Sequence, residues 1–446
     1  MDNRTRINEI AQFVIHPPEY PRIYAESGLQ LIRSQNVRPE GIDIAANKVF
    51  LAPEALKNKR VIRPGIGDLL IVRSGVNAGD MAMVEGPLNN CMIGADTLLA
   101  RFKNEITPKF LQVFFWTNLG EFILSRYITG ATNKHVSPHS FNKIEVPEIS
   151  LDRQMDVVAE FEKVLHKKRS KEKQAREILA GITGFLLEEL GIQFPQQEND
   201  GTQYRAFKTR FSKVTGNRFD PKRYSKETEN LYNAIESARY DKVPLKSLIT
   251  HSVAGNWGND PVESYNEKLW EKCLVIRATE FDNDFNLRLE NSRAKYRLIS
   301  KARRKKMDIR QNDLLLEKSG GSPDQPVGRV ALLDADILGS GTLCFSNFIH
   351  KFRTDNSRVV PEYLFCFLKF IHTIKLTDAM QSQTNGIRNL IMREYWNQSI
   401  VLPDIGEQKK IAAKYFELKT KARALLQEMN DEFTSSRKEI EDLILA

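Results

Sequence analysis

The sequence contains few cysteines and no long apolar run. Its four cysteines, Cys91, Cys273, Cys344 and Cys366, are far apart and form no CxxC pair, which argues against a disulfide framework or a zinc site. No apolar run reaches the roughly 18 residues that cross a bilayer, and the N-terminal stretch MDNRTRINEIAQF has no apolar core of a secretion signal. We therefore expect a cytoplasmic chain with reduced thiols and no membrane contact.

Motifs of the common DNA enzymes are also absent. The dipeptide Gly-Lys never occurs, so there is no P-loop for ATP. HPPEY, which begins at His16, only partly matches the motif of adenine methyltransferases, because Glu19 separates the prolines from Tyr20 and no glycine-rich loop for S-adenosylmethionine accompanies it. PDIGEQKK, from Pro403, has the letters of a nuclease motif, but its Glu is better explained as a favourable acid at a helix start.

Metal binding and catalysis are not indicated either. The seven histidines form no HExxH motif and no cluster with cysteines or acids at ligand spacing. We expect no metal, no cofactor bound by this chain and no catalytic residue.

The composition describes a globular chain with a basic surface. At 446 residues and 41% hydrophobic, the chain can form two to four domains with real cores. The net charge of +9 and the pI near 9.1 favour an anionic partner, and nucleic acid is the commonest. A basic but inert surface would explain the charge equally well.

Several short blocks of sequence occur twice along the chain. GDLLIVRSG, which begins at Gly67, returns as NDLLLEKSG from Asn312. In the same order, LIRSQNV matches VIRATEF, AGDMAMVE matches VGRVALLD, PKFLQVFFW matches PEYLFCFLK, GATNKH matches SQTNGIR, and IEVPEISLDRQ matches IVLPDIGEQ. Blocks in one order with small gaps indicate an internal duplication.

Each repeat ends in a long helical pattern with an apolar stripe. The spacing predicts that the two helices pair with each other, although two unrelated surface helices remain an alternative. A polar run, HKKRSKEKQ, interrupts the first stripe without a helix breaker. The residues expected in the pairing are Met155, Val158, Phe161, Leu165, Ile178, Ile182 and Phe185 in the first helix, and Ile411, Tyr415, Leu418, Ala422, Leu425 and Met429 in the second.

The predicted fold class is α/β (α+β), with two mixed domains joined by two long antiparallel coiled-coil helices in a pseudo-two-fold repeat. We expect a first mixed domain over 1–150, a first helix over 151–192, a linker and basic segment over 193–242, a second mixed domain over 243–404 and a second helix over 405–446. The basic segment, FKTRFSKVTGNRFDPKRYS, interleaves aromatics with cations. It could follow phosphates or simply pack its aromatics on the domain.

These repeated phrases resemble the specificity subunit of type I restriction-modification enzymes. The resemblance is carried by LIRSQNV, GDLLIVRSG, the ATNKH and QTNGIR turns, IEVPEISLDRQMDVVAEF, VLPDIGEQKKIAAKYF and NRFDPKRYS, so it extends over essentially the whole chain. It implies a non-catalytic DNA-binding subunit in which each variable domain reads one half of a bipartite, asymmetric target in double-stranded DNA.

The same resemblance implies the partners. Two methyltransferase subunits, which would bind S-adenosylmethionine, would dock on the long helices and methylate adenine, and a restriction/motor subunit would join through them. The alternatives are a coiled-coil scaffold of another DNA-defence complex, a protein-binding scaffold that does not read DNA, and a divergent methyltransferase.

Polar side chains in the repeated turns are the candidate DNA contacts, because arginine reads guanine while asparagine and glutamine read adenine. In the first repeat these are Arg33, Ser34, Gln35, Arg73, Ser74, Asn77, Thr132, Asn133, Lys134 and His135. In the second they are Arg277, Thr279, Lys318, Ser319, Gln383, Thr384, Asn385 and Arg388. Candidate phosphate contacts are Lys57, Arg60 and Arg63 in the first repeat, and Arg303 and Arg304 in the second.

Each candidate has a structural alternative. Arg33 and Arg277 recur at matching positions, so bracing of the fold or a phosphate contact is favoured over base reading. The Thr-Asn turns recur too, and asparagine there could simply tolerate a left-handed backbone. The lysine and arginine clusters could equally be solvated surface.

Overall fold

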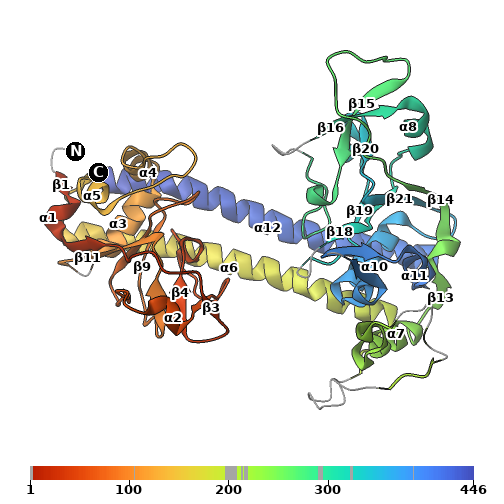
Figure 1. The fold of residues 1–446 in the computed structure, drawn as a ribbon, viewed down its shortest axis with the longest axis horizontal. Helices are drawn as coiled ribbons and strands as arrows, with labels where there is room; N and C mark the ends of the chain where they lie inside the picture. Colours follow the sequence, from red (N-terminus) through yellow and green to blue (C-terminus); the bar gives the residue numbers. More distant parts are fainter. Residues whose placement is uncertain are drawn as a thin grey trace. The chain divides into compact units, whose positions relative to one another are not determined.

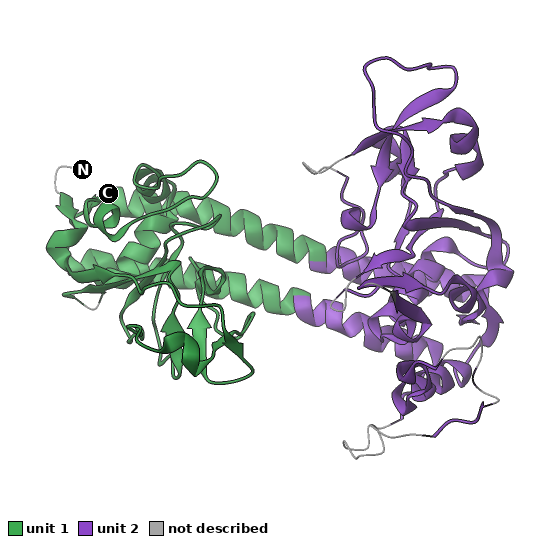
Figure 2. Cartoon of the chain, in the orientation of Figure 1, with its two compact units in different colours: residues 1–175, 423–446 green, residues 176–422 purple. Residues whose placement is uncertain are grey.

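The computed structural model describes residues 4–104, 106–195, 208–211, 214, 219–289, 295–321, 325–384 and 386–446. The chain divides into two compact units, shown in different colours in Figure 2. Unit 1 comprises residues 1–175 and 423–446, and unit 2 comprises residues 176–422. The two long helices, α6 (Leu151–Leu190) and α12 (Ile405–Leu445), each contribute one part to each unit.

Unit 1 is built on two small sheets (Figure 1). One is antiparallel, in the order β2 (Ala11–Ile15), β11 (Thr97–Phe102), β8 (Leu69–Val72), β9 (Met81–Met83). The other has the order β10 (Cys91–Ile93), β4 (Leu29–Ile32), β7 (Phe50–Leu51), β3 (Tyr24–Ala25), with β10 parallel to β4. Two shorter pairs are β1 (Arg4–Arg6) with β12 (Glu145–Pro147), and β5 (Val37–Arg38) with β6 (Gly41–Ile42).

The short helices of unit 1 begin at residues that suit helix starts. Proline occupies the first turn of α2, α3 and α5, where its missing N–H costs no hydrogen bond, and the Thr117 and Ser137 side chains cap α4 and α5. The helices are α1 (Ile7–Ile10), α2 (Pro53–Leu56), α3 (Thr107–Trp116), α4 (Asn118–Ser125) and α5 (Pro138–Asn142), with a 3₁₀ turn η1 (Ser34–Asn36).

Unit 2 repeats the two sheets. The antiparallel sheet has the order β14 (Ile249–Ala254), β21 (Ile349–Thr354), β17 (Leu314–Glu317), β19 (Val330–Leu332). The second has the order β16 (Tyr296–Ser300), β15 (Trp270–Ile276), β20 (Leu343–Phe345), with β15 parallel to β20. The remaining strands are β13 (Asp241–Pro244) paired with β24 (Ser399–Leu402), and β18 (Ser319–Gly321), β23 (Ile387–Leu390) and β22 (Gln381–Thr384) in one small sheet.

The helices of unit 2 are α7 (Lys226–Glu236), α8 (Lys301–Met307), α9 (Ala335–Gly339), α10 (Pro361–Thr373) and α11 (Met392–Asn397). The described part of this unit also contains the 3₁₀ turns η4 (Pro221–Tyr224), η5 (Leu245–Leu248), η6 (Ala278–Glu280) and η7 (Leu376–Met380). α7 lies in the segment predicted as linker, over 193–242. Much of the basic segment, residues 207, 212–213 and 215–218, lies outside the described residues.

The two units therefore share one topology. Strand order in the antiparallel sheet is the same, and each second sheet contains one parallel pair, β4 with β10 and β15 with β20. A mixed α/β fold with an internal repeat is what the sequence predicts, and the strand pairing confirms it.

One buried ion pair is also repeated. Asp68 and Asp313 are fully buried at the starts of β8 and β17. Arg101 binds Asp68 through two nitrogens at 2.7 and 2.8 Å, and Arg353 binds Asp313 at 2.7 and 3.0 Å. Such two-nitrogen pairing satisfies both carboxylate oxygens, so the charge can be buried.

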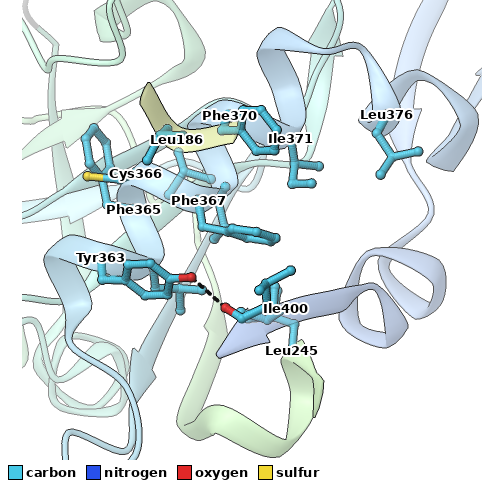
Figure 3. Close-up of a cluster of buried hydrophobic side chains, with 14 of the residues drawn as sticks. Leu186, Leu245, Tyr363, Phe365, Cys366, Phe367, Phe370, Ile371, Leu376 and Ile400 are labelled. Carbon is cyan, nitrogen blue, oxygen red and sulfur yellow. Dashed lines mark hydrogen bonds between the residues drawn. The ribbon is translucent and has the colours of Figure 1, made fainter. Parts of the chain in front are cut away.

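The core of unit 2 surrounds α10, whose sequence, PEYLFCFLKFIHT, is apolar on nearly all sides. Figure 3 shows Phe365, Phe367 and Phe370 of this helix among side chains from other elements. The buried Tyr363 hydroxyl donates to the Val401 carbonyl at 2.6 Å, which satisfies its polar group. The corresponding helix of unit 1, α3, is entirely buried.

Within unit 1, α6 and α12 run antiparallel. Lys171 of α6 forms ion pairs with Glu428 and Glu432 of α12 at 3.1 and 2.7 Å. Earlier in α6, Arg153 donates to the carbonyl of Leu443, near the end of α12, at 3.2 Å. Within unit 2, apolar side chains of both helices, including Ile182 and Ile411, join one core cluster.

The pairing face of α6 differs from the prediction at its start. Met155 is 48% exposed, whereas Val157 is 1% exposed and belongs to the core of unit 1. The expected stripe was therefore wrong at Met155: Val157 continues it because the helix turns a different face toward α3 and α12. The other predicted pairing residues lie on buried or partly buried positions: Val158, Phe161, Leu165, Ile178, Ile182, Phe185, Ile411, Tyr415, Leu418, Ala422, Leu425 and Met429.

Candidate nucleic-acid interface

In unit 1, two of the predicted polar turns meet directly. The Ser74 hydroxyl lies 3.0 Å from Nδ1 of His135, and the Gly75 amide donates to the Lys134 carbonyl at 3.1 Å. Thr132, Asn133 and Lys134 are exposed at the tip of this turn. The turn is tight: Gly130 has φ +94°, and a Cβ there would lie 2.2 Å from the Asn133 carbonyl oxygen, so only glycine fits.

The equivalent turns meet in unit 2. The Leu390 amide donates to the Lys318 carbonyl at 2.8 Å, and the Ser319 hydroxyl donates to the Asn389 side-chain oxygen. Arg388 lies on β23 opposite Gly321, and Gln383 is exposed on β22. Asn385 lies outside the described residues, and of Thr384 only the backbone is described, in β22.

A recess lies at the carboxyl ends of the parallel strands of unit 1. Arg33, Ser34 and Gln35 follow β4, and Gly94 to Asp96 follow β10. Together with Glu19 to Arg22 and Tyr24, these residues line a pocket of about 340 Å³. We call it recess 1. Ligands commonly bind outside the carboxyl ends of parallel strands, because the turns that follow the strands converge there.

The same position in unit 2 holds a second recess. Arg277, Ala278 and Thr279 follow β15, and Ser346, Asn347 and Phe348 follow β20. With Trp257 and Gly320 these residues line a pocket of about 420 Å³, which we call recess 2.

The arginines that open these turns also brace them. The Arg277 amide and guanidinium both donate to the Glu280 carboxylate, at 2.8 and 3.0 Å. In unit 1 the Arg33 amide donates to the Asn36 side chain at 3.0 Å, and its guanidinium donates to the Asn47 carbonyl at 2.9 Å. Their geometry supports a framework role for both arginines.

In each unit, one backbone hydrogen bond joins the recess to the two polar turns that contact each other. The Arg73 amide donates to the Asp96 carbonyl at 2.7 Å, and the Lys318 amide donates to the Phe348 carbonyl at 2.9 Å. Each unit therefore presents one edge, made of the recess and the adjoining turns. We call these edges 1 and 2.

Other predicted contacts lie elsewhere. Asn77 can place its amide oxygen 3.0 Å from Nη1 of Arg38 and lines a different pocket. Arg303 lies on α8, donates to the Ala254 carbonyl at 3.1 Å, and lines an open groove that shares Trp257 and Asn347 with recess 2. The remaining cations are exposed on the segment after α2 or partly exposed on α8: Lys57, Arg60, Arg63 and Arg304.

The surroundings of His135, a side chain of edge 1, change its pKa. Burial, together with the positive charge of Arg73, lowers the pKa of His135. A lowered pKa favours the neutral imidazole, which can donate one hydrogen bond and accept another.

Sequence reasoning missed several residues of the recesses. Asp96, Trp257, Asn347 and Phe348 were not expected, because their turns carry no basic or repeated polar phrase. The signal that could have found two of them is position: CMIGAD and LCFSNF end on Asp96 and Phe348, each three residues after a strand of the repeat.

Among the described residues, no group of His, Cys, Asp and Glu side chains could hold a metal ion. The described helices also include none that is long and apolar enough to cross a membrane.

Comparison with known proteins identifies the domain. Residues 264–432, most of the second repeat, match the family model described as type I restriction modification DNA specificity domain. This segment is therefore similar to the DNA specificity domain of type I restriction-modification systems. Unit 1 repeats the strand order of unit 2, which contains most of this match.

One of the similar solved structures, the first below, supports a shared fold. A chain from a structure on complex assembly and conformational transition of the type I R-M system is 14% identical, with a TM-score of 0.52, over 99% of this chain and 96% of that one. The HsdS subunit from Thermoanaerobacter tengcongensis is 15% identical, with a TM-score of 0.37, over 99% and 95%. The S subunit from M. genitalium is 10% identical, with a TM-score of 0.40, over 99% and 95%. A search of curated proteins finds no match.

The family is one of non-catalytic DNA-recognition subunits.

Proposed function

We propose that this chain is the specificity subunit of a type I restriction-modification system and that it reads a bipartite, asymmetric target in double-stranded DNA, one half through edge 1 and the other through edge 2. The observation that supports this most is that one edge is built twice on the same strands with different side chains. Both units contain the same framework ion pair, Asp68 with Arg101 and Asp313 with Arg353. The side chains that line the recesses differ, with Asp96 in unit 1 and Phe348 in unit 2.

The contacts within each edge have different roles. The proposed base readers are the exposed Asn133 and Lys134 in unit 1, and the exposed Gln383 with the partly exposed Arg388 in unit 2, because polar side chains in a groove can pair with base edges. Arg33 and Arg277 hold the turns in shape. Lys57, Arg60, Arg63, Arg303 and Arg304 are the proposed phosphate contacts, which supply affinity without sequence preference.

The partners follow from the family. We propose that two methyltransferase subunits, which bind S-adenosylmethionine, dock on the specificity subunit and methylate adenine in the bound target. A restriction/motor subunit joins through them, and the complex acts in the cytoplasm. The four cysteines are free and buried, which fits a reducing compartment.

The test is single-molecule sequencing of genomic methylation with and without the gene. A bipartite adenine-methylated motif should appear only when the gene is present. The Arg388→Ala variant should change bases in one half of the motif and leave the other half unaltered, because Arg388 belongs to edge 2 alone.

Two results would contradict the proposal. A methylome that does not respond to the gene would favour a scaffold without DNA reading. An Arg388→Ala motif altered in both halves would remove the assignment of one half to each edge. Asn385→Ala offers a second test of edge 2 with the same expected result.

A further inference from the structure

Recesses 1 and 2 occupy the same place in the repeat but have opposite character. Recess 1 is lined by charged and polar groups, among them Glu19, Arg22 and Asp96. Recess 2 is lined mainly by apolar groups, with Trp257 and Phe348 the largest. Asp96 and Phe348 are equivalent residues, because each carbonyl accepts the joining hydrogen bond from the strand-end turn, from Arg73 or Lys318.

The two aromatic side chains of recess 2 are fixed in exposed positions. Trp257 is 38% exposed and Phe348 is 41% exposed. Arg297 lies over the Trp257 ring at 4.7 Å and donates to the Trp257 carbonyl at 3.1 Å. The Phe348 ring rests against Gly320, where an added Cβ would lie 3.3 Å from Cδ2 of the ring. Exposed aromatics held in place indicate a contact surface.

The rim of recess 2 is polar and basic. Asn347 is exposed and lines both recess 2 and the adjoining groove, in which Arg303 lies. Lys318, whose amide donates to the Phe348 carbonyl, is partly exposed. An apolar floor with a cationic rim suits a base edge inside and phosphates outside.

Only one base offers an apolar group in the major groove. That group is the C5 methyl of thymine, and apolar side chains contact it, while asparagine pairs with N6 and N7 of adenine. We propose that recess 2 reads a T·A base pair, with Phe348 and Trp257 against the thymine methyl and Asn347 on the adenine. Recess 1 cannot read a methyl group in this way, because a carboxylate replaces the phenyl ring. This inference rests on the proposed function.

The experiment uses the specificity subunit in complex with its methyltransferase subunits and a duplex that carries the methylome-derived target. Each thymine in the half-site that responds to Arg388→Ala is replaced singly by deoxyuridine, which lacks only the methyl group. At one position, binding should weaken about four-fold, as expected for losing a buried methyl contact. Thymines of the other half-site, replaced in the same way, should show no such loss.

Variants tie the effect to the recess. Phe348→Ala should bind the thymine and deoxyuridine duplexes equally at that position. Tyr296→Ala is the matched control, because Tyr296 is 48% exposed in the same unit but does not line recess 2, and it should keep the four-fold preference. Thermal melting of each variant checks that it folds.

Several outcomes would overturn the proposal while the proposed function stands. These are a half-site without thymine, no effect of deoxyuridine in that half, or a preference that survives in Phe348→Ala. Loss of the methyltransferase from the Phe348→Ala complex, with the thymine preference unchanged, would make recess 2 a protein-docking site instead. Failure of the wild-type complex to bind any duplex would reject the proposed function itself.

Discussion

Buried polar side chains in this protein bind specific partners, and in unit 2 several of them surround the repeated ion pair and recess 2. The buried Lys351 donates to Asp313 at 2.9 Å, alongside the pair that Asp313 makes with Arg353. The buried Glu317 binds Arg329, which in turn donates to the carbonyls of Ala278 and Phe281. Arg329 thus holds the turn that forms one wall of recess 2.

His350 makes the stability of unit 2 depend on pH. Burial, and the nearby charge of Lys318, lower its pKa from 6.5 to about 4. The folded state therefore favours the neutral ring, whose Nε2 lies 2.7 Å from the Ser252 hydroxyl. The contribution is complete above about pH 6.5 and is lost as the pH falls through about 4, with a total of about 3 kcal/mol.

Urea unfolding between pH 7 and pH 4 tests this. The free energy of unfolding of unit 2 should decline toward pH 4 in the wild type, and His350→Gln should show a flatter decline. His139→Gln, at an exposed histidine of unit 1, is the control and should follow the wild type. Parallel curves for wild type and His350→Gln would contradict the prediction.

The long helices carry glycines with very different surroundings. Gly181 and Gly184 lie within α6, exposed, and a Cβ at either would meet nothing within 4 Å. Gly191 directly follows α6 with φ +64°, and a Cβ there would lie 2.8 Å from Cβ of Arg239. Glycine at positions 181 and 184 lowers the stability of the helix, whereas the backbone conformation at position 191 requires glycine.

Alanine substitution should therefore have opposite effects at these positions. Gly181→Ala and Gly184→Ala should each raise the free energy of unfolding by about 0.5–1 kcal/mol, because alanine favours the helix. Gly191→Ala, the matched control, should lower it by about 1 kcal/mol or more, because its backbone is left-handed and crowded. Chemical denaturation measures all three, and a gain in Gly191→Ala would show that this helix end is not constrained.

The start of helix α6 shows a feature that the local sequence pattern does not predict. The apolar spacing predicts the helix and most of its buried face, yet it places Met155 rather than Val157 inward. Both residues are apolar and two positions apart, so periodicity alone cannot choose between them. The choice is made by α3 and α12, which pack on one side of the helix only.

The net charge of +9 belongs to the molecule as a whole, and DNA binding should reflect it. Replacing Arg303, Arg304 and Lys305 together by Ala should weaken binding to cognate and random duplex alike. Each lost phosphate contact lowers the magnitude of the salt slope by about 0.9. Fluorescence anisotropy over a range of salt concentrations measures both effects.

A control variant keeps this prediction specific. Lys409, Lys414 and Lys421 are exposed on α12 and line neither recess, and replacing all three removes the same charge. This variant should retain nearly the full salt slope. A loss of binding confined to the cognate target in the α8 variant would contradict the assignment of that cluster to phosphates.

The sequence by itself determined the duplication, the mixed fold class, the two long helices and the turns that carry polar side chains. These follow from local periodicity, from turn residues and from phrases that recur in order. The tertiary structure alone decided which turns meet. Parallel pairing of β4 with β10, and of β15 with β20, joins segments about 60 to 70 residues apart in the chain, and so places Asp96 and Phe348 in equivalent recesses. No local pattern encodes that contact, because it arises only when distant strands share one sheet.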